Sequence, residues 1–171
     1  MRVALHWLCL LMLLTPLGCG YRPMGAAPAS PQGAPAIAIP PFTNRSTEVG
    51  LEAIMASAMI NAFAQTKAVK IAPRVEDADL ILDGKIRSID NTSVAYLDVT
   101  RSLVRRVTLR VEVELRRGKG GKVLWRDLMV LQEDYVVDPN YQAGEATRAE
   151  GLRRAAVNMA RRVMDKVLLV I

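Results

Sequence analysis

Residues 107–115 read VTLRVEVEL, and this stretch decides the fold that we expect for the chain. Every odd position carries an aliphatic residue, and every even position carries a hydroxyl or a charged group. Because successive side chains of a strand point to opposite faces, this alternation predicts a strand with one buried and one solvated face. A sheet of such strands needs a second layer on one face only.

The segments that follow predict a second strand and a helix. Residues 116–122 read RRGKGGK and predict a turn, so residues 123–135 are expected to return as the partner strand of a hairpin. Residues 136–140 break that strand. Thr147 and Glu150 then match a capping box, and apolar residues follow at helical spacing from Leu152 to Val167. We expect a helix there, laid on the sheet.

The segments that precede residue 107 predict further strands and a first helix. Residues 80–89 predict a strand with Gly84 as a bulge or a close approach, and residues 91–98 either extend this strand or form a loop. Residues 69–72 are consistent with a short strand. Residues 36–39 predict another, which ends at Pro40 because proline donates no ladder hydrogen bond. A helix is expected from Glu48 to Thr66, after a polar loop whose hydroxyls can cap it.

These elements predict a two-layer α+β sandwich in the order β-α-β-β-β-α. We expect about four strands in a mostly antiparallel sheet, with two helices packed on one face, because two helices are too few to cover both faces. The helix expected at residues 48–66 has no charge between Glu52 and Lys67. Its back face is either an ordinary exposed surface, since alanine is tolerated both in solvent and in a core, or an interface with a partner. The candidate interface residues are Ala53, Ala56, Ile60 and Ala64.

The first 35 residues differ in composition from the rest. Arg2 precedes an apolar run at residues 3–14, which is shorter than the roughly 20 residues that span a bilayer. Gly18 and Cys19 follow, an order typical of a lipoprotein signal, although Pro16 stands where an aliphatic residue is usual. We expect a signal peptide at residues 1–18 and a lipid on Cys19, with ordinary secretory cleavage as the alternative. Residues 19–35 then form the lipidated, Pro/Gly-rich flexible tether, and residues 36–171 form a single domain.

The composition of the expected domain excludes most catalytic chemistry. The chain's single His, His6, and Cys9 lie in the signal, and Cys19 would carry lipid. The domain then has no imidazole or thiol for nucleophile pairs, disulfides or the commonest metal ligands, which leaves carboxylate, Lys or Tyr chemistry. We therefore expect no enzyme, no metal and no cofactor. The net charge of +6 favours anionic lipid, lipopolysaccharide or acidic protein as partners of an exported chain, and no nucleic acid.

Five stretches in order resemble the lipopolysaccharide-assembly lipoproteins of the LptE family. They are CGYRP at 19–23, IAIPPF at 37–42 with Asn44, ADLILDG at 78–84, GKVLW at 121–125, and EA at 145–146 followed by LRRAA at 152–156. The resemblance covers nearly the whole mature chain. It implies a lipid-anchored outer-membrane lipoprotein, on the periplasmic side, that plugs and helps assemble an LptD-type β-barrel. It also implies binding of lipopolysaccharide during its delivery to the outer leaflet.

Two further points stay open at the level of sequence. Residues 37–44 also look like the opening of outer-membrane lipoproteins that activate a peptidoglycan synthase, so such an activator is the alternative function. Basic side chains suit the phosphates of lipid A, although they are also common on a solvated sheet edge, in part paired with Glu112 and Glu114. The candidate lipopolysaccharide-binding residues are Arg105, Arg106, Arg110, Arg116, Arg117, Lys119 and Lys122.

Overall fold

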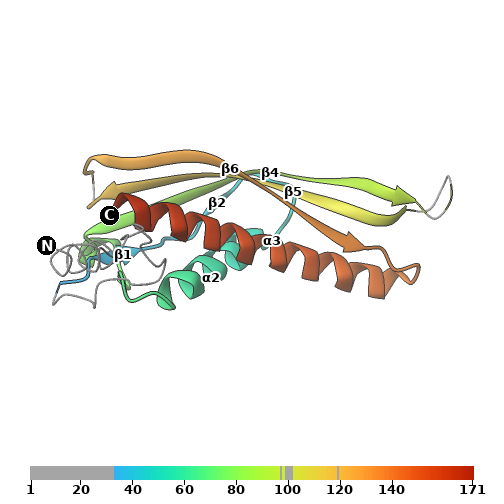
Figure 1. Cartoon of the computed structure of the whole chain (residues 1–171), viewed down its shortest axis with the longest axis horizontal. Helices are drawn as coiled ribbons and strands as arrows, with labels where there is room; N and C mark the ends of the chain where they lie inside the picture. The colour runs from blue at the N-terminus through green and yellow to red at the C-terminus, as the bar shows by residue number, and fades with distance from the viewer. Residues whose placement is uncertain (1–32, 97, 99–101, 119) are drawn as a thin grey trace, which may run out of the picture.

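The computed structural model describes residues 33–96, 98, 102–118 and 120–171, which form a sheet with two helices on one of its faces (Figure 1). The two-layer α+β class predicted from the sequence is confirmed. The elements in chain order are β1 (Ala36–Ala38), β2 (Thr43–Asn44), α2 (Leu51–Ala64), β3 (Lys70–Ile71), the 3-10 turn η1 (Val75–Asp77), β4 (Leu80–Tyr96), β5 (Ser102–Arg117), β6 (Val123–Val136) and α3 (Tyr141–Val170).

The sheet has six strands, in the order β3-β1-β4-β5-β6, with β2 also paired to β4. The expectation of about four strands was too low. The short strand offered at residues 69–72 is present as β3, whereas β2 was missed because it has two residues and shows no periodicity. The long strands β4, β5 and β6 are antiparallel, with Leu82 opposite Leu115 and Leu109 opposite Leu131. The short strands β1, β2 and β3 make parallel pairs.

Residues 91–96 extend β4 rather than forming a loop, so β4 and β5 make a long two-stranded ribbon. Of the two roles expected for Gly84, a bulge or a close approach, the structure shows the close approach, because the Phe42 ring packs against its backbone. A Cβ atom added there would lie 2.1 Å from Cε2 of the Phe42 ring. The irregularities in the pairing with β5 lie further along the strand, between Ile86 and Ser88 and again between Ser93 and Tyr96. The absence of a side chain at Gly84 therefore makes room for Phe42 in the core.

The core lies between the sheet and the two helices. All five odd positions of residues 107–115 are buried, as the alternation predicted. Burying an aliphatic side chain of this size stabilises a fold by about 1.5 to 3 kcal/mol, so this strand is the centre of the core. The helices contribute the large buried side chains Met55, Met59 and Phe63 from α2, and Met159 and Val163 from α3.

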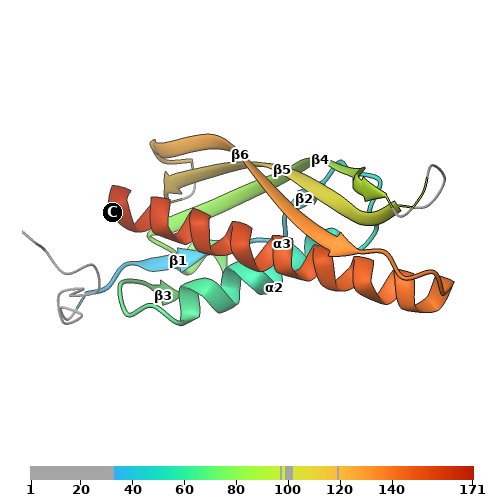
Figure 2. The same cartoon turned by 45° about the vertical axis from the view of Figure 1, so that its right-hand side comes forward.

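Helix α3 begins earlier than the sequence predicted. Asn140 is its N-cap, and the Asn140 side chain accepts hydrogen bonds from the backbone N–H of Gln142 at 3.0 Å and of Ala143 at 3.2 Å. The capping box assigned to Thr147 was wrong, because Thr147 lies inside the helix and its hydroxyl donates to the Gly144 carbonyl. The helix has 30 residues and is about 45 Å long, so it follows the sheet from end to end (Figure 2).

Helix α2 is shorter than expected at both ends. It starts after Gly50, whose φ of 83° is left-handed, and no side chain caps it. The C-terminal end of α3 lies at the same end of the molecule as β1, whereas α3 starts at the end where β4 meets β5 (Figure 1). Among the described residues, no helix has the length and apolar character needed to cross a membrane.

Candidate functional site

The face of the sheet turned away from the helices is a ladder of ion pairs. It carries the even positions of β5 and their neighbours on β4 and β6. Arg106 holds Asp134 through two hydrogen bonds, at 2.6 and 2.9 Å. Arg116 Nε donates to Asp83 at 2.8 Å. The further pairs on this face are Arg87 with Glu112, Arg110 with Asp90, and Arg126 with Glu114.

Two of these pairs favour the charged form of their carboxylates. The hydrogen bond from Arg106 lowers the pKa of Asp134 below its ordinary value, and the same contact raises the pKa of Arg106. The hydrogen bond from Arg87 likewise lowers the pKa of Glu112. Both carboxylates are ionised at neutral pH, so the arginines of the ladder already have anionic partners. An external phosphate must exchange with these carboxylates before it can bind there.

The candidate lipopolysaccharide-binding residues do not form one cluster. Arg106, Arg110 and Arg116 belong to the ion-pair ladder, and Lys119 lies outside the described residues. The side chains of Arg105, Arg117 and Lys122 are exposed and make no ion pair within the part of the chain that the structure describes.

Arg105 and Arg117 lie near opposite ends of β5. Twelve residues of extended strand separate them, or about 40 Å. The basic side chains without an ion pair among the described residues therefore fall into two groups at opposite ends of β5. One lies at the β4–β5 end of the ribbon, and the other lies at the turn between β5 and β6.

The candidate interface on α2 faces solvent for most of its length. Ala53, Ile60 and Ala64 are exposed, with 39% of Ile60 accessible, and Ala56 is half-buried. No charged side chain lies on α2 after Glu52. The arrangement gives a smooth, uncharged surface that another protein could cover without desolvating a charge.

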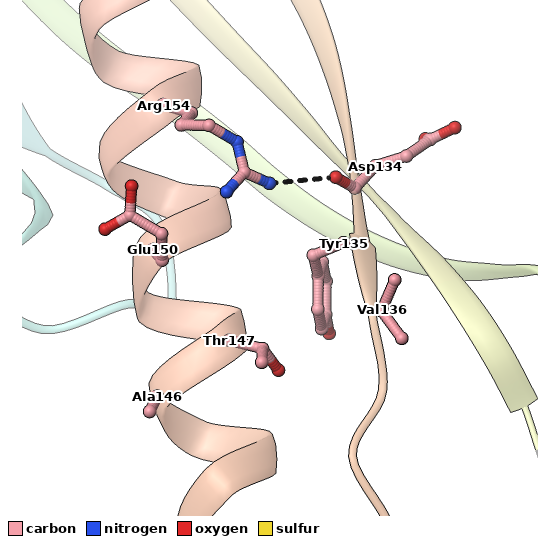
Figure 3. A pocket seen from close by; sticks show the side chains of 7 residues that line it. All are labelled: Asp134, Tyr135, Val136, Ala146, Thr147, Glu150 and Arg154. Atoms are coloured by element: carbon pink, nitrogen blue, oxygen red, sulfur yellow. Dashed lines mark hydrogen bonds between the residues drawn. The ribbon is translucent and has the colours of Figure 1, made fainter.

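A hollow that sequence reasoning missed lies between the end of β6 and the first half of α3 (Figure 3). Its volume is about 470 Å³. Gly151 brings the helix close to the strand here, since an added Cβ would lie 3.1 Å from Cβ of Tyr135. The residues that line it are Asp134, Tyr135, Val136, Ala146, Thr147, Glu150 and Arg154.

Arg154 forms one border of this hollow and connects α3 to β6. Its Nε lies 3.0 Å from Glu133 Oε1, and its Nη2 donates to the backbone carbonyl of Asp134 at 3.0 Å (Figure 3). A second hollow of about 300 Å³ continues along α3 on the other side of Arg154. It is lined by Glu150, Arg153, Arg154, Val157, Asn158 and Arg161.

The titratable groups that line the two hollows are carboxylates, arginines and one tyrosine. Within the described ranges there is no His or Cys, and no cluster of three or more metal-binding side chains. Arg154 is the one cation shared by both hollows, and its guanidinium already contacts Glu133. The arrangement therefore offers charged and aromatic side chains to a bound molecule.

Comparison with known proteins gives a family match over most of the chain. The family model described as LptE, lipopolysaccharide-assembly, matches residues 34–167. No curated protein matches the chain in sequence.

Solved structures share the fold at low sequence identity. A protein of Xanthomonas campestris has a TM-score of 0.57 at 11% identity, and the alignment covers 84% of this chain and 89% of that one. A structure assigned as a lipoprotein of Caulobacter crescentus has a TM-score of 0.51 at 15% identity, covering 71% and 83%. A PelC dodecamer from Paraburkholderia phytofirmans has a TM-score of 0.50 at 17% identity, covering 80% and 90%. At these identities the structures are similar to this chain in fold alone.

Proposed function

This chain belongs to the LptE family of lipopolysaccharide-assembly proteins, and from that premise we propose that it is the lipoprotein partner of an outer-membrane β-barrel of the LptD type. In this role it plugs the barrel, helps it to assemble, and binds lipopolysaccharide on its way to the outer leaflet. The observation that carries the proposal is the family match over residues 34–167. The match includes nearly all of the α+β domain at residues 36–171, for which we propose no enzymatic activity.

The proposed location follows from the start of the chain. Residues 1–18 act as the signal, Cys19 carries the lipid, and residues 19–35 tether the domain to the periplasmic side of the outer membrane. Two or more acyl chains on one residue give stable anchoring, whereas one chain binds only marginally. Cys19 and nearly all of the tether lie outside the described residues. Mass spectrometry of the mature N-terminus tests this part of the proposal, and an unmodified Cys19 contradicts it.

The proposed barrel interface is the uncharged face of α2, formed by Ala53, Ala56, Ile60 and Ala64. A lysine at the exposed position 60 would place a charge in that interface at little cost to the free chain. We expect Ile60→Lys to fold normally and to lose most of the co-purifying barrel, whereas the apolar control Ile60→Leu keeps it. Equal capture of the barrel by both variants would remove α2 from the interface.

The proposed lipopolysaccharide site has two separable parts. A variant with Ser at Arg116, Arg117, Lys119 and Lys122 removes the basic residues at the β5–β6 turn, and a variant with Ser at Arg105 alone changes the opposite end. Binding of purified lipopolysaccharide is measured for both. If the four-residue variant binds as tightly as the unmodified chain, the turn is not the site. Arg106, Arg110 and Arg116 are second-choice ligands because carboxylates already pair with them, so Arg117, Lys119 and Lys122 are the first-choice ligands at the turn.

One capture experiment tests the proposed function as a whole. The lipidated chain is purified from outer membranes, and the proteins that come with it are identified. We expect a large β-barrel. A penicillin-binding protein in its place would favour the activator of a peptidoglycan synthase, and it would contradict the present proposal.

A further inference from the structure

Strand β6 forms one edge of the sheet, and half of its backbone polar groups point away from the sheet. The backbone N–H of Val137 donates to the carbonyl of Leu103 at 2.9 Å, so odd positions at this end of the strand point toward β5. Backbone groups alternate in direction along an antiparallel strand. The register with β5 is unbroken from residue 125 to residue 136. The even positions from Arg126 to Val136 therefore point their N–H and C=O groups outward.

Arg154 supports this direction independently. It donates to the backbone carbonyl of Asp134, an even position, from outside the sheet (Figure 3). Within the part of the chain that the structure describes, nothing else pairs with the outward groups of residues 126–132. Exposed edge groups of this kind are a template for one more strand. Leu128 and Val130 lie on the same stretch and are 54% and 46% exposed, so they offer apolar cross-strand contacts.

The first hollow lies at this edge, because it is lined by the end of β6 and by α3. The second is lined by α3 residues alone and adjoins the first through Glu150 and Arg154, which line both. Side chains of an added strand alternate between the two faces of the sheet, so every second one would point toward α3 and these hollows. We call the outward edge of β6 together with the two adjoining hollows the β6–α3 groove.

We propose that an extended, acidic segment of the barrel partner binds in the β6–α3 groove as an added strand on β6. This inference rests on the proposed function and adds to it the surface and the chemistry of the contact. The edge supplies paired backbone hydrogen bonds between Arg126 and Gln132. The α3 side of the groove favours carboxylates, because the second hollow is lined by three arginines and one glutamate.

The charges of α3 are the reason for an acidic occupant. Arg161 is exposed and makes no ion pair with any described residue, and Arg153 makes only an exposed contact of 3.8 Å with Glu150. Carboxylates on an added strand would find the Arg161 guanidinium free and would compete with Glu150 for Arg153. Arginine binds such groups through paired hydrogen bonds, which gives direction as well as attraction.

A second copy of the chain fits the groove less well. Pairing β6 with β6 of another copy around a two-fold axis would bring the arginine-bearing sides of the two α3 helices together. On β6 itself, Arg126, Glu133 and Asp134 are already paired with Glu114, Arg154 and Arg106. Asp127 is then the one exposed carboxylate of this strand that could face the arginines of another copy. Like charges opposed in this way disfavour association.

Two matched pairs of variants test the proposal in the full-length lipidated chain. Gln132→Pro removes one outward N–H and leaves the ladder to β5 intact, whereas its control Gln132→Thr keeps that N–H. Arg153→Glu with Arg161→Glu reverses the charge, whereas Arg153→Lys with Arg161→Lys keeps it. The barrel that co-purifies is quantified for each. We expect at least a tenfold loss for the Pro and Glu variants, and less than a threefold change for their controls.

Photo-crosslinking locates the contact. A photoreactive residue at Leu128 is expected to join an acidic segment of the barrel, and one at Ser57 on α2 reports the separately proposed α2 interface. Equal capture by Gln132→Pro and Gln132→Thr, or a crosslink from Leu128 to a second copy of the chain, would overturn the proposal. If circular dichroism finds Gln132→Pro unfolded, the charge variants decide alone. If the unmodified chain captures no barrel, the proposed function itself is contradicted. If the unmodified chain captures the barrel and the groove variants capture it equally well, only the proposed groove is contradicted.

Discussion

Replacing Gly84 by alanine should destabilise the domain strongly, because β4 touches an aromatic ring at this position. Phe42 is 3% exposed, and its ring faces Gly84. An added Cβ would lie 2.1 Å from Cε2 and 2.3 Å from Cδ2 and Cζ of that ring. Carbon atoms pack at about 3.5 Å or more, so the ring would have to retreat by roughly 1.4 Å.

The expected loss of stability is about 3 kcal/mol. Overpacking a core usually costs about 1 to 3 kcal/mol, and this contact is shorter than a small adjustment can relieve. Expelling Phe42 altogether sets an upper bound, since Phe-to-Ala changes in a core cost roughly 3 to 5 kcal/mol. The ring is closed in by the core, so we expect the upper part of the overpacking range.

Urea denaturation of the mature chain with Cys19→Ser measures the effect. A double-mutant cycle with Phe42→Ala isolates the contact. In the Phe42→Ala background, Gly84→Ala should lower the free energy of unfolding by less than about 1 kcal/mol. The loss in the double variant should therefore be smaller than the sum of the two single losses by roughly 2 kcal/mol. A Gly84→Ala variant as stable as the unmodified chain, or two costs that simply add, would refute this account of the packing.

Three further changes test other parts of the structure. Asn140→Ala removes the cap of α3 and should lower the free energy of unfolding by about 1 kcal/mol, measured by urea denaturation. Arg148→Met breaks the half-buried contact with Glu48, which joins α3 to the segment before α2, and should cost about 1 kcal/mol in the same assay. The ion pair of Arg106 with Asp134 should stabilise the fold fully at pH values above 3.8, the ordinary carboxyl pKa. This stabilisation should be lost as the pH falls through the lowered pKa that Asp134 has in the folded chain. Unfolding curves of Arg106→Leu and the unmodified chain should therefore converge at acidic pH, and a constant difference would contradict the assigned pair.

The long strands and both helices could be predicted from the sequence because each has a regular apolar pattern. The alternation at residues 107–115 identified β5 and the buried face correctly. The start of α3 could not be read in this way. Residues 141–150 of α3 include no buried side chain, so they lack an apolar stripe. Thr147 and Glu150 match the capping-box pattern by chance, because the helix begins at Tyr141, directly after its N-cap Asn140.

The candidate site was harder to predict because it depends on strand order. The sequence shows the basic residues but not which carboxylates face them, and the partners Asp83, Asp90 and Asp134 come from the neighbouring strands. A local pattern also cannot indicate that β6 forms an edge of the sheet. The groove beside it depends on the path of α3 and on Gly151, a glycine that nothing in the helical spacing singles out.

The order of the strands also has a consequence for how the domain folds and opens. Strands β4, β5 and β6 pair with their neighbours in sequence, whereas β1 reaches β4 across more than 40 residues, as in the pair Ile37 and Leu80. Local pairs form early, and long loops are closed late. We expect residues 80–170 to fold as one unit onto which β1, β2 and α2 dock. Hydrogen exchange should then find the amides of β1 opening more readily than those of β5. The segment next to the tether would be the last to dock and the first to detach under a pull from the membrane.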